Sequence, residues 1–232
     1  LSTATGTVAA SAVFPSFAIG KPGPSANSKV NVAFIGSGGW IARQPYEQGC
    51  KDENLVAFCD VDRPLCAENM KNWGTTETPF YDDFRVMLDK MGDDIDAVAI
   101  STPDHIHFAA AMAAMERGKH VFIQKPLAHN VWQCRTLRKA AKHYKVITQM
   151  GNQGHTFEGM RRIKEWTDAG IIGEVQEVIT WTNRPNAPWF VPPSQFPPKS
   201  GPAPATLDWD LWQGPTKHRP YSADYVPVRW RG

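Results

Sequence analysis

Short apolar runs alternate with helical patterns along the first two thirds of the chain. The run Ala97–Ile100 is followed by a polar turn, by a helical pattern over roughly Ile106–Arg117 and by a second apolar run at His120–Ile123. Apolar runs of four or five residues without regular polar alternation are typical of strands that are buried on both faces, as in parallel sheets. Two such strands joined by a helix form a parallel β–α–β unit, and the pattern predicts one over this stretch.

A second unit of the same kind lies upstream. The residues Lys29–Ile35 have a strand pattern, a glycine-rich turn follows, and a helical stretch then leads to the apolar run Leu55–Cys59. Pro45 lies inside the predicted helix, so we expect that helix to be kinked or to begin late. Strands that alternate with helices predict an α/β fold, here a Rossmann-like doubly wound parallel sheet over residues 29–150.

The glycine-rich turn has the character of a dinucleotide-binding motif. In such motifs glycine lets backbone amides approach a pyrophosphate at a helix N-terminus, and an acid about 20 residues further on binds ribose hydroxyls. Asp60 stands at the end of the next strand, 24 residues after Gly36. The candidate residues of the turn are Gly36, Ser37, Gly38, Gly39, Trp40 and Ile41. Because Ile41 replaces the third glycine of the motif, a glycine turn in another kind of α/β protein is the alternative.

Polar residues also follow the later strands. Ligands of parallel sheets collect at the carboxyl ends of the strands, so these residues are candidates for contact with a cofactor. They are Ser101, Thr102, Pro103 and His107 after one strand, Gln124 and Lys125 after the next, and Asn152 after the strand Val146–Met150. A lysine beside a proline that restricts the backbone suits chemistry better than packing, which makes Lys125 the candidate catalytic residue. For Asn152, a polar turn between domains is the alternative.

Together these motifs resemble the Gfo/Idh/MocA oxidoreductases. The resemblance rests on the pattern DAVxIxTPxxxH…GKHVxxxKP, downstream of the glycine turn and of the strand end CDVD. The segments TQMGNQGH, EVITWTNRP and LDWDLWQGP, followed by RPY and WRG, are similar to the exported, sugar-modifying branch of the family. The resemblance covers the chain from Lys29 to Gly232.

The resemblance implies a fold and an activity. The fold is an N-terminal Rossmann domain that binds NAD(P), followed by an α+β domain whose open sheet covers the nicotinamide and the substrate. The activity is hydride transfer to or from a sugar-like or polyol-like carbohydrate. The resemblance also implies that Lys125 positions the substrate and polarises its hydroxyl, that His107 lines the nicotinamide cleft, and that the full-length protein is a homo-oligomer.

The chain departs from the family pattern in two places. Gln124 stands where the family has a glutamate, which keeps the hydrogen-bonding shape of that side chain without its charge. The family's catalytic Asp and His belong to a segment that would follow Gly232, and residues 151–232 contain one predicted strand, Glu174–Thr182. We therefore expect a fragment of a longer enzyme, with an incomplete α+β domain over residues 151–232 and negligible turnover by these residues alone.

More than one cofactor and more than one kind of reaction are compatible with these residues. Asp60 would repel a 2′-phosphate whereas Arg63 could neutralise one, so we favour NAD and keep NADP as possible. A glycoside-cleaving enzyme that retains NAD for transient oxidation and elimination is one alternative to net redox chemistry. A dinucleotide-binding module without catalysis is the other.

Composition and charge bear on which class of partner the protein binds and on where in the cell it is located. The 25 Lys and Arg residues and 23 Asp and Glu residues are interspersed and give a formal net charge of +2, so there is no electrostatic basis for nucleic-acid binding. Residues 1–28 begin with twenty uncharged residues and resemble an export signal that lacks its basic start. The family resemblance favours twin-arginine export to the periplasm without stable membrane insertion. A membrane anchor, or a disordered tail on a cytoplasmic protein, is the alternative.

Cysteine, histidine and tryptophan are three further residue types that could take part in a site. Cys50, Cys59, Cys66 and Cys134 form no C-x-x-C pair, and we expect four unpaired thiols. No metal site is predicted, because the neighbouring histidines at 105 and 107 would point in different directions from a helix start. Trp189 in the proline-rich stretch 184–204, together with Trp209 and Trp212, would either stack on pyranose rings or contact a neighbouring subunit.

Overall fold

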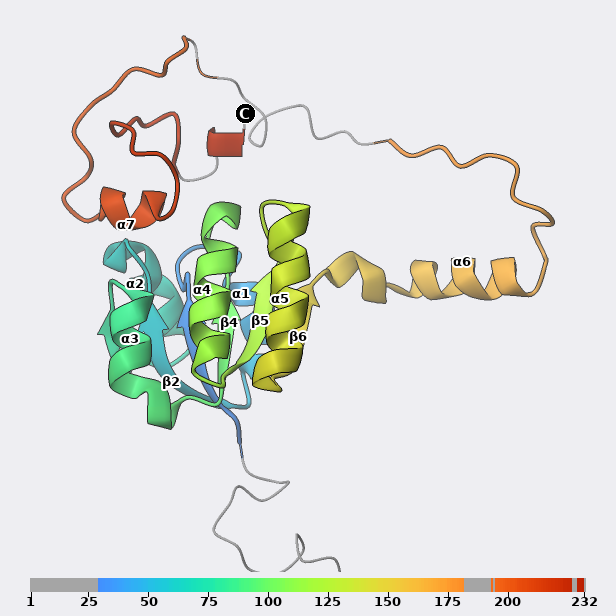
Figure 1. The fold of residues 1–232 in the computed structure, drawn as a ribbon, viewed down its shortest axis with the longest axis horizontal. Coiled ribbons are helices and arrows are strands. Elements are labelled where there is room, and N and C mark those ends of the chain that lie inside the picture. Colours follow the sequence, from blue (N-terminus) through green and yellow to red (C-terminus); the bar gives the residue numbers. More distant parts are fainter. Residues whose placement is uncertain (1–28, 182–192, 194, 227–228, 232) are drawn as a thin grey trace, which may run out of the picture.

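The computed structural model describes residues 29–181, 193, 195–226 and 229–231 of the chain. They form a six-stranded parallel sheet with helices on both faces (Figure 1). The strand order is β3-β2-β1-β4-β5-β6, and the order reverses between β1 and β4. Doubly wound sheets bind their ligands at such a reversal, at the carboxyl ends of the strands. The predicted α/β fold with a Rossmann-like doubly wound sheet is confirmed.

The sequence patterns located five of the six strands to within a few residues, whereas the strand Phe80–Tyr81 and the helix Phe84–Met91 were not predicted. The strands are β1 (Asn31–Ile35), β2 (Asn54–Cys59), β3 (Phe80–Tyr81), β4 (Ala97–Ile100), β5 (His120–Gln124) and β6 (Thr148–Gly151). The helices are α1 (Arg43–Pro45), α2 (Arg63–Asn72), α3 (Phe84–Met91), α4 (Asp104–Glu116), α5 (Val131–Tyr144), α6 (Glu158–Asp168) and α7 (Trp209–Gln213). Short 3₁₀ turns lie at Gly92–Asp94, Gln153–Thr156 and Arg229–Arg231. As Pro45 predicted, the helix after the glycine turn is irregular, since α1 continues as a π-helical stretch at Tyr46–Cys50.

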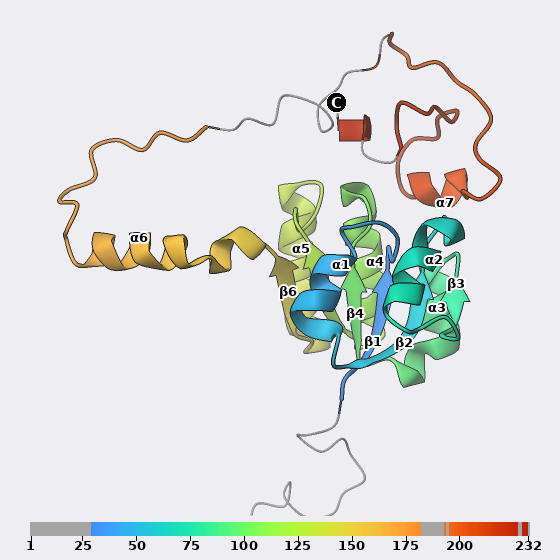
Figure 2. The same ribbon diagram turned by 180° about the vertical axis from the view of Figure 1, so that it is seen from behind.

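Two apolar layers hold the helices on the sheet. On one face α3, α4 and α5 cover the strands, and Met87, Ile100 and Leu137 are buried between them (Figure 1). On the other face α1 and α2 cover Phe34 and Phe58 (Figure 2). Each fully buried side chain of this size contributes about 1.5–3 kcal/mol. Because both faces are covered, the central strands have the continuous apolar sequences that made them recognisable.

Beyond β6 the chain leaves the sheet. The helix α6 extends away from the Rossmann domain and its residues are exposed (Figures 1 and 2). The strand predicted at Glu174–Thr182 was wrong for residues 174–181, which are exposed and have no regular structure. A strand requires a neighbour for its backbone hydrogen bonds, and none of the described residues pairs with this segment. Thr182 itself lies outside the described residues.

Residues 195–226 fold back over the carboxyl ends of the strands, and we call them the returning segment (Figure 1). Asp62 forms an isolated antiparallel bridge with Leu207, and the amide of Asp208 donates to the carbonyl oxygen of Val61 at 2.9 Å. Residues that are about 150 positions apart in the sequence thereby become neighbours. The predicted export signal (residues 1–28) and residues 184–192 and 194 of the proline-rich stretch lie outside the described residues.

The tryptophans of the returning segment contact other aromatic residues of that segment. The rings of Trp209 and Trp212 are stacked, with centroids 4.8 Å apart, and Tyr221 and Tyr225 also contact Trp209. The indole nitrogen of Trp209 donates to the carbonyl oxygen of Arg219 at 2.8 Å. These rings therefore form a small aromatic core that gives the segment its shape. All four cysteines are free thiols, as predicted.

Candidate functional site

A cavity of about 360 Å³ lies at the carboxyl ends of the strands, between the glycine turn and the returning segment. Its volume is in the range of sites for small molecules. The candidate residues that line it are Gly36, Gly38, Gly39, Trp40, Ile41, Asp60, Ser101, Thr102 and Pro103. The candidates that do not line it are Ser37, His107, Gln124, Lys125 and Asn152. The structure thus brings together the residues that follow β1, β2 and β4 in one site.

The glycine turn lies close to the loop that follows β4. Gly36 has a φ of +81°, and a β-carbon at this position would lie 2.6 Å from the backbone nitrogen of Thr102. Glycine is therefore required both for the backbone conformation and for the close approach. Gly39 also has a positive φ, and no atom lies within 4 Å of the position of its missing β-carbon. That open space leaves room for a ligand to approach the backbone of the turn.

The missing third glycine of the motif has a local explanation. Ile41 lines the cavity, whereas Ala42 directly after it is fully buried in the layer beneath α1 and α2. The third glycine of this motif serves close packing between helix and sheet. In this chain the small side chain of Ala42 stands at that contact, one position later.

Asp60, the residue after β2, is hydrogen-bonded to the glycine turn. Its Oδ2 accepts a hydrogen bond from the amide of Gly38 at 2.8 Å, and its Oδ1 accepts one from the amide of Asp62 at 3.1 Å. Burial raises the pKa of the Asp60 carboxyl, while these two backbone hydrogen bonds act in the opposite direction. A carboxylate in this position can accept hydrogen bonds from the hydroxyls of a ribose.

The side chain of Ser37 faces the protein interior. It is fully buried, and its hydroxyl donates to the carbonyl oxygen of Cys59 at 3.4 Å and to Sγ of Cys66 at 3.3 Å. Burial raises the pKa of the Cys66 thiol well above its ordinary value, so this thiol remains protonated. Ser37 therefore joins the turn to β2 and α2 through its side chain.

Asn69 of α2 supports the turn and was not among the sequence candidates. Its Nδ2 donates to the carbonyl oxygens of Ser37 at 2.9 Å and Gly39 at 2.8 Å, and the side chain is buried. Its Oδ1 accepts a hydrogen bond from Nε of Arg43 at 2.8 Å. A polar residue on the apolar side of a predicted helix is the signal that could have pointed to it.

Two buried hydroxyl groups lie at the end of β4. Ser101 Oγ and Thr102 Oγ1 are buried and have no hydrogen-bond partner among the described residues. Buried polar groups in proteins are nearly always hydrogen-bonded, and exceptions point to a ligand or water. Both residues line the cavity, with their hydroxyl oxygens buried beneath its surface.

His107 connects the loops that follow β4 and β5. The ring is fully buried, with Nδ1 at 2.7 Å from the carbonyl oxygen of Pro126 and Nε2 at 2.9 Å from that of Thr102. His107 therefore connects the backbones of the two loops and does not line the cavity.

The candidates after β5 and β6 lie outside the cavity. Lys125 is exposed at the end of β5, and Gln124 before it is buried and donates through Nε2 to Oε1 of Gln44 at 3.4 Å. This contact joins β5 to α1. Asn152 is exposed after β6, and its backbone forms the turn to His155. Lys125 follows β5 and Asn152 follows the edge strand β6, and neither residue lines the cavity.

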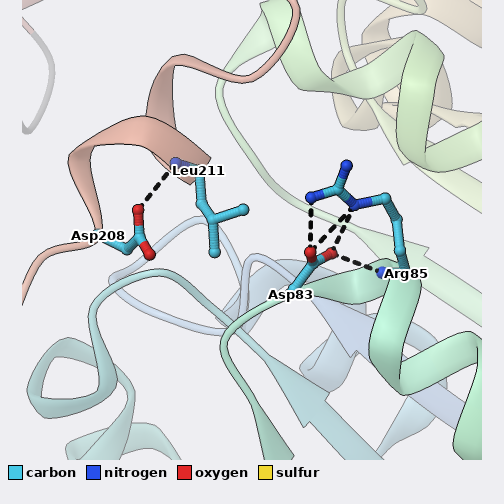
Figure 3. Close-up of polar contacts among 4 residues, drawn as sticks. All are labelled: Asp83, Arg85, Asp208 and Leu211. Atoms are coloured by element: carbon cyan, nitrogen blue, oxygen red, sulfur yellow. Dashed lines mark hydrogen bonds and ion pairs between the residues drawn. The ribbon is translucent and has the colours of Figure 1, made fainter.

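Four acidic residues line the cavity. Besides Asp60, the carboxylates of Asp62, Asp82 and Asp83 line it. Asp83 caps α3 by accepting from the amide of Arg85 at 2.8 Å, and its carboxylate also binds the Arg85 guanidinium (Figure 3). The hydrogen bonds from Arg85 lower the pKa of Asp83. The guanidinium of Arg63 lies over the ring of Phe80, 4.9 Å from its centroid.

The sheet, the glycine turn and the acid at the end of the next strand define a dinucleotide-binding Rossmann domain. Residues 30–152 match the model of the Gfo/Idh/MocA oxidoreductase family, described as an NAD-binding Rossmann fold. The chain belongs to this family. The unpartnered hydroxyls and the open glycine turn fit an NAD-binding site in this position.

Relatives with known names include dehydrogenases of sugars and inositols and 2,7-anhydro-N-acetylneuraminate hydratases, one of them from Escherichia coli, 30% identical over 39% of this chain and 25% of that protein. Levoglucosan dehydrogenase of Pseudarthrobacter phenanthrenivorans is 28% identical over 136 residues, which are 56% of this chain and 34% of that protein. Inositol 2-dehydrogenase/D-chiro-inositol 3-dehydrogenase of Halalkalibacterium halodurans is 31% identical over 121 residues, which are 52% of this chain and 34% of the relative. The match therefore spans about a third of the length of these two relatives.

A solved structure shares the fold. Scyllo-inositol dehydrogenase of Lactobacillus casei, determined with bound NAD(H) and scyllo-inositol, superposes with a TM-score of 0.55 at 24% identity. The superposition covers 63% of this chain and 43% of that chain. None of the described helices is both long enough and apolar enough to span a bilayer.

Proposed function

We propose that the intact protein transfers a hydride between the nicotinamide of NAD and a sugar-like or polyol-like substrate. The observation that carries this proposal is the cavity that joins the glycine turn, Asp60 and the two unpartnered hydroxyls of Ser101 and Thr102. The names of the dehydrogenase relatives support the substrate class.

The residues of the chain have distinct roles in this proposal. The amides of the glycine turn bind the pyrophosphate, and Asp60 accepts hydrogen bonds from the adenosine ribose. Bound NAD supplies the hydride acceptor or donor at its nicotinamide ring. Lys125, exposed at the end of β5, orients the substrate oxygen and donates a hydrogen bond to it. We assign the proton-transferring Asp or His to an α+β substrate domain, of which residues 151–232 are the beginning.

The charges around the cavity favour NAD over NADP. A 2′-phosphate would stand next to Asp60, with three further carboxylates lining the same cavity. The guanidinium of Arg63 contacts the ring of Phe80, and that of Arg85 is paired with Asp83. We therefore expect NAD to bind at least about tenfold more tightly than NADP, a ratio that corresponds to about 1.4 kcal/mol.

We also retain twin-arginine export to the periplasm as a proposal, based on the resemblance of residues 1–28 to an export signal.

The proposal is tested with the protein carrying its substrate domain and a panel of sugars and polyols. NADH formation from at least one of them is expected, and its absence for every compound would overturn the proposal. Lys125→Met should abolish turnover while leaving the dissociation constant of NAD unchanged. Lys139→Met is the matched control, because Lys139 is exposed on α5 away from the cavity and its loss should leave turnover unchanged.

A further inference from the structure

The cavity has a wall that the Rossmann motif does not account for. The family match ends at residue 152, yet Leu207, Leu211 and Trp212 of the returning segment line the same cavity as the glycine turn. Figure 3 shows α7 above the loops of the Rossmann domain, with the side chain of Leu211 directed toward them. We propose that these residues form one side of the adenine-binding slot of the NAD site. This inference rests on NAD binding as proposed above.

The positions of the glycine turn and Asp60 determine where the adenine would lie. In NAD the adenosine ribose stands between the pyrophosphate and the adenine. With the pyrophosphate at the glycine turn and the ribose at Asp60, the adenine extends past Asp60 along the cavity. Val61 directly follows Asp60 and lines the cavity together with Ile106 from the Rossmann domain and with Leu207 and Leu211 from the returning segment.

The chemistry of this end of the cavity suits a flat, largely apolar ring. The side chains of Val61, Ile106, Leu207 and Leu211 are aliphatic, and the indole of Trp212 stands beside them. Aliphatic side chains on both sides of a planar ring remove both of its faces from water, which is the main source of affinity for aromatic groups. The Rossmann domain supplies Val61 and Ile106, and the returning segment supplies Leu207 and Leu211.

The returning segment is attached on both sides of the slot. Near β2, the amide of Asp208 donates to Val61, and near α4 the carbonyl oxygen of Trp212 lies 2.8 Å from Nε2 of His105. Gly214 lies so close to α4 that a β-carbon would be 2.3 Å from Cδ1 of Ile106. These contacts hold α7 against the loop after β2 and against the start of α4. These hydrogen bonds and this close packing therefore set the position of α7 relative to the Rossmann domain.

A helix cap orients Leu211 within that wall. Oδ1 of Asp208 accepts a hydrogen bond from the amide of Leu211 at 2.9 Å (Figure 3). Side-chain caps of this kind stabilise a helix start by about 1 kcal/mol. Because α7 has only five residues, this cap determines how the helix begins and hence where Leu211 points.

The proposal is tested with ADP-ribose, which contains the adenosine and the pyrophosphate but no nicotinamide. Its affinity is measured by calorimetry for the parent chain, for Leu211→Asp and for Ile163→Asp. We expect Leu211→Asp to weaken ADP-ribose binding by at least about tenfold, since it places a charge against an apolar ring. Ile163→Asp makes the same change on the exposed side of α6 and should leave the affinity unchanged.

Amide hydrogen exchange keeps the test independent of how the variant folds. ADP-ribose bound to the parent chain should slow exchange in residues 207–214, in addition to the glycine turn. Protection of the glycine turn alone, or an unchanged affinity of Leu211→Asp, would overturn the adenine wall and leave NAD binding intact. If the parent chain binds neither ADP-ribose nor NAD, the NAD-dependent function itself fails.

Discussion

Gly36 and Thr102 approach each other so closely that a β-carbon on the first would lie 2.6 Å from the backbone nitrogen of the second. The contact joins the turn after β1 to the loop after β4, which are the two loops at the point where the strand order reverses. The site therefore depends on the absence of a side chain at one position of the turn.

Replacement of Gly36 by alanine should damage both folding and cofactor binding. The new side chain meets backbone atoms and the residue has a φ of +81°, so we expect a loss of about 2–4 kcal/mol in the free energy of unfolding. Urea titration measures this loss, and calorimetry with NAD measures the loss of affinity. Gly159→Ala is the control, because nothing lies near its missing β-carbon and it stands within α6. An equal effect at both positions would contradict the role of the close contact.

Replacement of Asn69 by alanine should weaken NAD binding without any direct contact to NAD. The change removes two hydrogen bonds to the backbone of the glycine turn and leaves their carbonyl oxygens to find other partners. A cost of about 1–3 kcal/mol in stability is expected, with a higher dissociation constant for NAD. Asn72, exposed at the end of the same helix, provides the control Asn72→Ala. If both variants bind NAD equally well, the turn does not depend on Asn69.

Replacement of His107 by alanine should loosen the loops after β4 and β5 together. The ring lies 2.9 Å from the carbonyl oxygen of Thr102 and 2.7 Å from that of Pro126, and a neutral imidazole donates to one of them at a time, so its removal should cost about 1–3 kcal/mol. Thermal unfolding measures the loss. His143→Ala on the exposed side of α5 should leave the melting temperature within a degree or two of the parent. A His107→Ala protein as stable as this control would show that the connection is not needed.

The stability of the protein without NAD should fall as the pH rises through the pKa of Asp60. Burial raises this pKa above its value in the unfolded chain, so the folded state holds a proton that the unfolded state has already released. The contribution of Asp60 is therefore favourable below its unfolded pKa, near 3.9, and is lost above that value as the folded carboxyl ionises. Unfolding in urea at a series of pH values tests the slope. Asp60→Asn should remove this part of the pH dependence, and an unchanged slope would contradict the assignment.

NAD binding should depend on the same carboxyl in the opposite sense. The ribose hydroxyls donate to the ionised form, so affinity should rise with pH over the window in which Asp60 loses its proton. Calorimetric titration of NAD across that window gives the dependence. In Asp60→Asn the affinity should be lower than in the parent and should not vary over this window, whereas a parallel rise in both proteins would assign the effect to another group.

Local sequence was sufficient for the Rossmann half. The runs that became β1, β2, β4 and β5 are apolar because helices cover both faces of the sheet, and such runs are visible without knowledge of any contact. The positions of Gly36 and Asp60 were also predictable, since strand ends bring them to the same edge of the sheet. The roles of Ser37 and Asn69 were not, because the direction of a side chain depends on how α2 packs against the turn.

The second half shows the limit of local patterns. The residues from Glu174 have an alternating sequence that is typical of a strand, yet a strand forms only when a neighbour offers backbone partners, and the described residues offer none. The predicted domain boundaries at 29–150 and 151–232, and the assignment of the later part to a substrate domain, stay predictions.

The sequence by itself determined the order of strands and helices, the glycine turn and the acid at the end of β2, because periodicity and strand ends are properties of neighbouring residues. Only the tertiary structure decided that Leu207 and Leu211 line the same cavity as Val61 and Ile106. Contacts between residues that are far apart in the sequence arise from the packing of a short helix against two loops, and no local pattern encodes them.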